Sequence, residues 1–141
     1  QFLDDQAGDV IFRAGSGCTL ATINANGGSI ETDCALTTVN LTAGTWTHTV
    51  GAIGTVVNET GTVLDLSNGT ITAYTGLEGS TYDHRSDSRP KVYTAVVLQG
   101  GATWLDPNGA ANTYTAGIVL ADCRLEDVTI DVGLDATITP A

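Results

Sequence analysis

Apolar positions return along the chain in a phrase that is repeated three times between residues 20 and 61. Each copy has an apolar residue, a spacer, a threonine and a second apolar residue, followed by a short polar run, a glycine and a third apolar residue. The copies begin at Leu20, Leu36 and Ile53, their glycines are Gly27, Gly44 and Gly61, and their third apolar residues are Ile30, Trp46 and Val63. The starts lie 16 and 17 residues apart. A fixed period of this length is typical of a solenoid in which each copy forms one coil.

The same phrase continues more loosely toward the C-terminus. Further copies begin at Ile71, Tyr93 and Tyr114, at spacings of 18, 22 and 21 residues. Their third apolar residues are Tyr82, Trp104 and Leu125. We therefore predict six coils, with larger loops in the later ones, and an extra strand over residues 128–132.

The residue types favour strands. Thr, Val, Ile and Tyr are frequent, whereas the helix formers Lys, Arg, Glu and Met are scarce or absent. The units are also too short for helix pairs, which need more than about 30 residues. Leu20 and Ile23 lie three positions apart, so a corner between two short strands is needed to point both inward. The predicted fold is all-β, a single-stranded right-handed parallel β-helix of about six coils, with neighbouring coils about 4.8 Å apart.

Most of the chain is assigned to this solenoid. We predict an N-terminal arm or cap over residues 1–17, the β-helix over 18–135 with a projecting loop at 82–91, and a C-terminal tail over 136–141. An uncovered β-helix end exposes unpaired strand edges, so we expect a cap, another subunit or further chain to cover it. The sequence starts with Gln and has no secretory signal, which indicates a processed protein or a piece of a longer one.

The chain is strongly acidic, with 16 Asp or Glu, five Lys or Arg and a formal net charge of −11. This balance disfavours nucleic acids and anionic membranes as partners, because both carry negative charge. No apolar run approaches the roughly 20 residues that a membrane span requires. We interpret the charge mainly as protection against aggregation, with an acidic recognition surface as the alternative.

Residues 82–91 break the repeat with the sequence Tyr-Asp-His-Arg-Ser-Asp-Ser-Arg-Pro-Lys, which holds three of the five basic residues. A stretch without apolar periodicity is typical of a loop that projects from a solenoid. We predict a partner-contact loop formed by His84, Arg85, Asp87, Arg89 and Lys91. Arg85 and Arg89 would pair with carboxylates of a neighbouring copy or a larger partner, because the planar guanidinium binds carboxylates in a bidentate way. A solvated loop without a partner is the alternative.

Two of the three cysteines are predicted to stack. Cys18 and Cys34 both lie two residues before the first apolar position of their coils, which places them on neighbouring coils within rough disulfide reach. A stacked pair of small buried residues is the simpler interpretation, and a disulfide bridge is the alternative. A metal site is not expected, because the chain has no CxxC motif and its two histidines are far from the cysteines.

Paired carboxylates are the catalytic signal to test in a parallel β-helix, because glycoside hydrolysis needs two carboxyl groups about 5–9 Å apart in a groove. The candidates are Asp65, Asp83, Asp87, Asp106 and Asp131, and we expect no two of them to occupy the same repeat position. The tryptophans and tyrosines mostly fall on apolar positions of the repeat, so core packing explains them better than a sugar-binding groove does. His48, which shares a strand face with Trp46, is expected to be an exposed or hydrogen-bonded strand residue.

No nucleotide-binding loop, HExxH or GxSxG motif is present. A Ca²⁺ site among Asp122, Glu126 and Asp127 is conceivable, but the segment lacks the alternating ligand string of such sites. We therefore expect no catalytic residues, no cofactor and no metal site.

Two stretches carry a resemblance to a known class of proteins. The first is Thr-Ile-x-Ala-x-Gly-Gly-x-Ile, over residues 22–30, and the second runs from Asp87 to Ala102 and is followed by Asp106-Pro107-Asn108-Gly109. Both resemble β-helix segments of tailed-bacteriophage virion proteins, such as capsid decoration proteins and tailspike or fibre segments. The resemblance covers roughly residues 18–130. It implies a trimer located on the outer surface of a virion.

The function expected from these observations is that of a non-enzymatic virion structural protein. The first candidate is a capsid decoration or cementing protein on a phage head, with the major capsid protein or other virion proteins as partners. The second is a tailspike or tail-fibre segment that binds or degrades host surface polysaccharide, although tailspike enzymes of this class are typically far longer. The third is a bacterial surface solenoid or adhesin.

Overall fold

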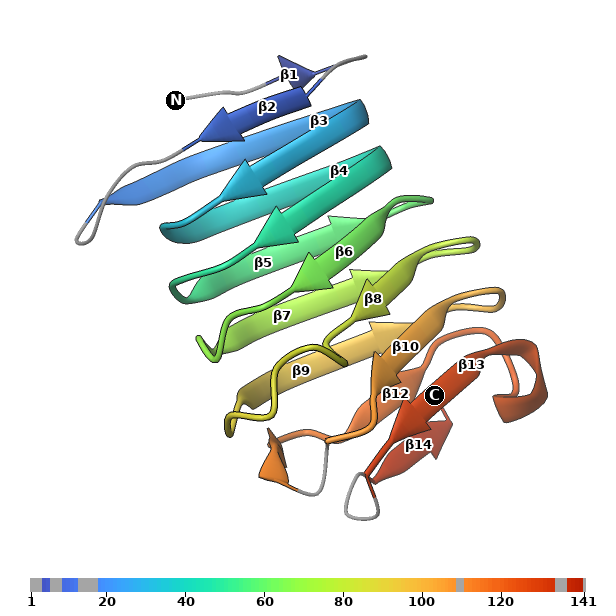
Figure 1. Ribbon diagram of the computed structural model, residues 1–141. Coiled ribbons are helices and arrows are strands. Elements are labelled where there is room, and N and C mark those ends of the chain that lie inside the picture. Colours follow the sequence, from blue (N-terminus) through green and yellow to red (C-terminus); the bar gives the residue numbers. More distant parts are fainter. Residues whose placement is uncertain (1–3, 6–8, 13–17, 109–110, 134–136, 141) are drawn as a thin grey trace.

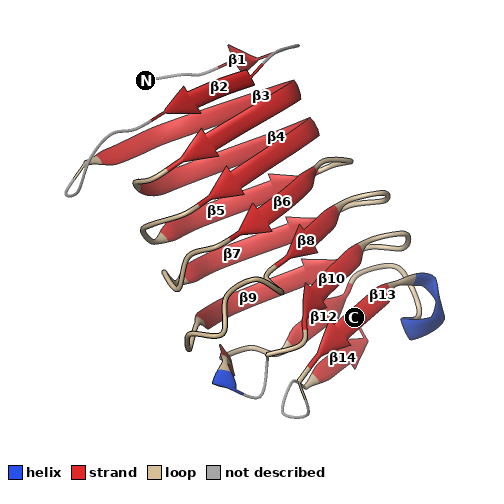
Figure 2. Ribbon diagram, in the orientation of Figure 1, coloured by secondary structure: helices blue, strands red, loops and turns tan. Residues whose placement is uncertain are grey.

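The repeated phrases fold into strands that stack as the coils of a β-solenoid with about six turns. The computed structural model describes residues 4–5, 9–12, 18–108, 111–133 and 137–140. All strand pairings in this part of the chain are parallel, which confirms the predicted parallel β-helix. Figure 2 shows that strands and loops make up nearly all of it, and helical structure is limited to short turns such as η2 (Leu125–Asp127).

The strands are β1 (Asp4–Asp5), β2 (Asp9–Phe12), β3 (Thr19–Thr32), β4 (Ala35–His48), β5 (Ile53–Asn58), β6 (Thr62–Asp65), β7 (Ile71–Gly76), β8 (Thr81–Asp83), β9 (Val92–Leu98), β10 (Thr103–Asp106), β11 (Thr113–Tyr114), β12 (Ile118–Leu120), β13 (Thr129–Val132) and β14 (Ile138–Pro140). They form two stacks, which the long strands β3 and β4 join at a corner (Figure 1). The first stack contains the first halves of β3 and β4, then β5, β7, β9, β12 and β14. The second contains the second halves of β3 and β4, then β6, β8, β10 and β13.

The core consists of vertical columns of apolar side chains between the two stacks. Leu20 pairs with Leu36, Leu36 with Ile53 and Ile53 with Ile71, so the predicted column exists. It continues through Tyr93 and Tyr114. A second column is formed by the third apolar residues of the phrase, Ile30, Trp46, Val63, Tyr82 and Trp104, which are at most 1% exposed. Each coil therefore buries the apolar residues of the next, which is how a solenoid gains stability.

The sixth coil differs from the prediction. Leu125 does not occupy the third apolar position; it lies in η2 and is 56% exposed. Ile130 takes that position, because it pairs with Trp104. The predicted extra strand is thus the second strand of the sixth coil, since a longer loop after β12 displaces the repeat by several residues.

Both ends of the chain carry additional strands. The backbone of β1 and β2 pairs with β3, so the described parts of the N-terminal segment lie against the first coil. β14 pairs with β12 and its pairing ends at Pro140. Strand pairing therefore extends into the region predicted to be a tail, up to a residue that cannot donate a backbone hydrogen bond.

Glycine is required at the corner where the two halves of β4 meet. Gly44 has a φ of +90°, in the region that favours glycine. A Cβ atom placed there would lie 2.6 Å from the carbonyl carbon of Gly27, one coil below. Neighbouring coils lie about 4.8 Å apart, which leaves no room for a side chain between the backbones of stacked corners. The glycines of the repeated phrase therefore allow these corners to stack directly.

Candidate functional site

The predicted contact loop is divided between the surface and the interior. Arg85 and Arg89 are exposed, with 56% of each side chain accessible, and they pair with Asp83 and Asp87 of the same loop. Arg85 donates to both carboxylate oxygens of Asp83 at 3.0 and 2.7 Å. Each of these acids also accepts the backbone N–H of its arginine, so every pair closes a local turn. The guanidinium groups have ligands within the loop before any partner binds.

The other three residues of the predicted contact set point inward. His84 is 0%, Lys91 1% and Asp87 7% exposed. The loop is thus fastened to the preceding coil, whereas the sequence predicted five side chains available to a partner. The physical reason is that the coil starting at Ile71 has more residues than one turn needs, and the excess folds back across the solenoid's corner.

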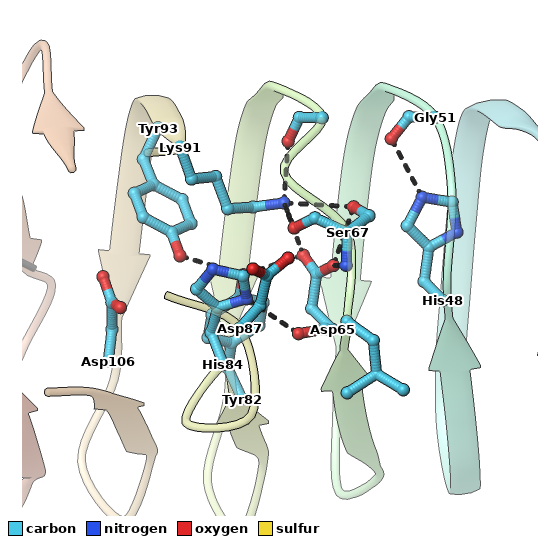
Figure 3. Close-up of polar contacts among 12 residues, drawn as sticks. His48, Gly51, Asp65, Ser67, Tyr82, His84, Asp87, Lys91, Tyr93 and Asp106 are labelled. Atoms are coloured by element: carbon cyan, nitrogen blue, oxygen red, sulfur yellow. Dashed lines mark hydrogen bonds and ion pairs between the residues drawn. The ribbon is translucent and has the colours of Figure 1, made fainter. Parts of the chain in front are cut away.

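An ion pair inside the solenoid holds the end of this loop (Figure 3). The Lys91 ammonium lies 2.8 Å from Asp65 Oδ2, and both side chains are 0% exposed. Lys91 also donates to the carbonyl oxygens of Ser67 at 3.0 Å and Gly69 at 2.7 Å. Burial lowers the pKa of Lys91, and the nearby Asp65 carboxylate opposes this shift. The cation is compensated by charge and by hydrogen bonds, as a buried ammonium requires.

The Asp65 carboxylate is equally well satisfied. Its Oδ1 accepts hydrogen bonds from the backbone N–H and the hydroxyl of Ser67, both at 2.9 Å. Its Oδ2 accepts the hydroxyl of Tyr82 at 2.8 Å, and that hydroxyl also lies 3.1 Å from the Tyr93 hydroxyl. Burial raises the pKa of Tyr82 well above its ordinary value, with the Asp65 charge acting in the same direction. Tyr82 therefore remains a hydrogen-bond donor to Asp65.

Asp65 belongs to a column of polar residues inside the solenoid, which we call the polar ladder. It takes one residue from each of five successive coils, two positions after the third apolar residue: Thr32, His48, Asp65, His84 and Asp106. All five are 0% exposed. The expectation that no two candidate acids share a repeat position is therefore wrong, because Asp65 and Asp106 lie in the same column with His84 between them.

The second histidine of the chain, His48, is hydrogen-bonded through both ring nitrogens. Its Nδ1 lies 2.9 Å from the Thr32 hydroxyl, which also accepts the indole N–H of Trp46 at 2.9 Å. Its Nε2 lies 3.0 Å from the carbonyl oxygen of Gly51. Since the carbonyl can only accept, Nε2 carries the proton and Nδ1 accepts from Thr32. His48 is thus a buried, neutral side chain. The sequence predicted an exposed or a hydrogen-bonded strand residue, and the structure confirms the hydrogen-bonded one.

His84 and Asp106 complete the ladder. His84 Nδ1 donates to the carbonyl oxygen of Asp65 at 2.7 Å, while its Nε2 has no hydrogen-bond partner among the described residues. Asp106 accepts two hydrogen bonds from the Asn112 amide, at 3.0 and 2.9 Å, and one from the Tyr114 hydroxyl. Burial raises the pKa of Tyr114, and the Asp106 charge adds to the shift. The aromatic residues around the ladder pack in the core, as the repeat predicted.

The chemistry open to this arrangement is limited by burial. Asp65 and Asp106 lie two coils apart, a separation of about 10 Å, close to the spacing of the carboxyl pair in inverting glycosidases. Both are 0% exposed, and their oxygens accept hydrogen bonds from protein groups. The more accessible acids Asp83 and Asp131 also share a column, on the outside of the second stack, with Leu105 between them.

The two predicted stacking cysteines are adjacent in register. Thr19 pairs with Ala35, so Cys18 and Cys34 precede equivalent positions of neighbouring coils. Both thiols are free; Cys18 is exposed and Cys34 is buried. Burial raises the pKa of the Cys34 thiol, with the nearby Asp33 charge adding to the shift. The expectation of two buried residues holds for Cys34 only.

In the described part of the chain, no three His, Cys, Asp or Glu side chains gather in a way that could hold a metal ion. The acids at Asp122, Glu126 and Asp127 therefore do not form such a group. The helical turns among the described residues are too short to span a membrane.

The stability of the protein is expected to fall in mild acid because of His48. Burial lowers the pKa of His48 below its ordinary value of 6.5. The unfolded chain therefore binds this proton more readily, so the stabilisation is present above about pH 6.5 and is lost progressively below it. Urea denaturation at about pH 7.5 and 5.5 should show a lower free energy of unfolding at the lower pH. His48→Gln should reduce the difference, and an unchanged pH dependence in this variant would contradict the assignment.

The ladder was missed because the repeat was followed only through its apolar residues. Counting two positions beyond Ile30, Trp46, Val63, Tyr82 and Trp104 would have found all five members.

The chain matches no protein-family model, no curated protein and no solved structure.

Proposed function

We propose that this chain is a non-enzymatic structural protein whose solenoid is a rigid scaffold for contacts with other proteins. The observation that carries the proposal is the complete burial of His48, Asp65, His84 and Asp106. A catalytic acid or base must come within hydrogen-bond reach of the proton that it transfers. Groups that are closed off from solvent and hydrogen-bonded to neighbouring parts of the protein suit a role in holding the coils together.

The more specific role that we propose is that of a capsid decoration or cementing protein on the outside of a phage head. It is supported by the resemblance of residues 22–30 and 87–102 to virion β-helices. It is also supported by Arg85 and Arg89, which are the exposed cations of the loop that lengthens the fourth coil. Its partners would be the major capsid protein or other virion proteins, and further copies of the chain.

Binding to undecorated capsids tests this role. The purified chain should sediment together with capsids assembled from the major capsid protein of the same virion. The double variant Arg85→Ala/Arg89→Ala should bind at least about tenfold more weakly, because the two exposed cations of the loop are lost from the contact surface. Arg124→Ala is the matched control, since the Arg124 side chain is 83% exposed on a different surface.

Two results would contradict the proposal. Release of reducing ends from host capsular polysaccharide or lipopolysaccharide would support the tailspike alternative and an enzymatic function. Absence of binding to capsids, combined with attachment to bacterial cells, would support the surface-solenoid alternative.

A further inference from the structure

Over six coils, one face of the solenoid carries no charge. The chain has 21 charged residues, yet none lies in residues 19–25, 35–41, 53–58, 71–76, 92–98 and 113–120. The charged strand β1 (Asp4–Asp5) pairs with the first half of β3, at the N-terminal edge of these coils. Outward positions of the six uncharged stretches are Thr, Ala, Val, Asn and Gly only. We call the outward surface of the first stack the neutral face.

Elsewhere on the described surface, acids outnumber the exposed cations Arg85, Arg89 and Arg124. The outward side of the second stack has Glu31, Asp83 and Asp131. The corners that follow β5, β7 and β12 have Glu59, Glu78 and Asp122. The neutral face is thus an uncharged centre with acids along part of its border, which resembles the charge-depleted core and polar rim of protein interfaces.

The neutral face is also regular. Thr22, Thr38 and Thr55 lie in one column that continues with alanines at 73 and 95. A parallel column contains Asn24 and Asn40, whose amides are hydrogen-bonded at 2.8 Å, and it continues through the half-buried residues Val57, Thr75, Val97 and Val119. These short side chains leave a low surface over strands that lie side by side in Figure 1. Low, regular sheet faces can pack on one another with their side chains interdigitated, about 10 Å apart.

The size of the face fits a protein interface. Six coils at about 4.8 Å and strands of seven residues at about 3.3 Å per residue cover roughly 600 Å². Two such faces in contact would bury about 1,200 Å² in total, the lower limit of stable specific interfaces. Val92, a large apolar side chain that is 38% exposed, lies on this face and would gain burial.

Charge identifies the partner. A chain with a net charge of −11 is repelled by its own copies wherever acids face one another. The neutral face is where two copies can approach without opposing charges, and a basic partner would prefer the acidic surfaces. We propose that the neutral face binds the neutral face of a second copy of this chain, which forms a closed twofold dimer.

The proposal is tested by measuring the mass of the protein in solution, first for the wild type and then for a variant with one added charge on the neutral face. Sedimentation over roughly 1–200 μM should give a species of twice the 14.5 kDa of the chain. Thr75→Lys places a cation in the middle of the neutral face, and the twofold axis brings two such cations into the interface. Since like charges opposed across an interface cost several kcal/mol, dimerisation should weaken at least about a hundredfold.

Leu64→Lys is the matched control, because Leu64 is a half-buried outward residue of a middle coil on the second stack. This variant should remain dimeric. Thr55→Lys provides a second substitution on the neutral face, and circular dichroism establishes that each variant is folded. A wild-type chain that is a monomer at every concentration, or a trimer as the resemblance implies, would overturn the proposal. So would a dimer that Leu64→Lys dissociates and Thr75→Lys does not.

This inference is independent of the virion role. The mass of the isolated chain decides it, whereas capsid binding by the arginine variants decides the proposed function. A neutral polysaccharide is another occupant for such a face. If the chain is monomeric and Thr75→Lys abolishes binding to an uncharged glycan array, that occupant replaces the second copy.

Discussion

Replacing Lys91 with methionine is expected to lower the free energy of unfolding by about 3–5 kcal/mol. Methionine retains most of the apolar stem but removes the ammonium, which leaves Asp65 as a buried carboxylate without its cation. Three hydrogen bonds to the corner of the third coil are lost as well. Urea denaturation followed by circular dichroism measures the change.

Two further variants separate the buried pair from a general effect of removing a charge. Arg85→Met breaks an ion pair on the exposed side of the same loop, and it should leave the free energy of unfolding almost unchanged. The double variant Lys91→Met/Asp65→Asn should recover part of the loss, because no unpaired charge then remains in the interior. If Lys91→Met is as stable as the wild type, the interior placement of this side chain is wrong.

Replacing Trp104 with alanine is expected to cost about 3–5 kcal/mol, the usual range for emptying a large buried aromatic site. Trp104 is 0% exposed, and its ring stacks on Tyr82 with the centroids 3.9 Å apart. It also meets Tyr74 and Tyr93 edge to face, at 5.0 and 5.3 Å. The cavity would therefore open in the most aromatic part of the core, where rigid rings cannot collapse to fill it.

The controls for this prediction vary the size and the place of the change. Trp104→Phe should cost less than the alanine variant, since it retains an aromatic ring, although it removes the hydrogen bond from the indole N–H to the Tyr114 hydroxyl. Leu125→Ala should have little effect, because Leu125 is 56% exposed outside the columns. A loss of under about 1 kcal/mol for Trp104→Ala would contradict the packing described here.

The parallel stacking was predictable from Leu20, Leu36 and Ile53 because in-register coils convert sequence spacing directly into a vertical column. The same relation located Trp46, Val63, Tyr82 and Trp104. It failed at Leu125, where a longer loop between the two strands of the coil shifts the repeat. Loop length is not constrained by coil stacking, so the period alone cannot locate a strand that follows a long loop.

The candidate site was less predictable than the fold. Arg85 and Arg89 lie on the surface, as the composition of residues 82–91 suggested. The inward direction of His84 and Lys91 could not be inferred, because polar residues are buried only when partners are available. Those partners come from other coils and are not visible in the local pattern.

The sequence by itself determined the coil period, the strand type and the inward apolar columns, because these depend on which residues recur at which spacing. It also determined that the apolar stretches 19–25, 35–41, 53–58, 71–76 and 92–98 carry no charge. Only the tertiary structure decided that Lys91 reaches back 24 residues to Ser67 and that five polar residues form a ladder inside the solenoid. Such contacts arise from the path of loops between coils, and the energy that selects this path comes from charges and hydrogen bonds that meet only when the chain is folded.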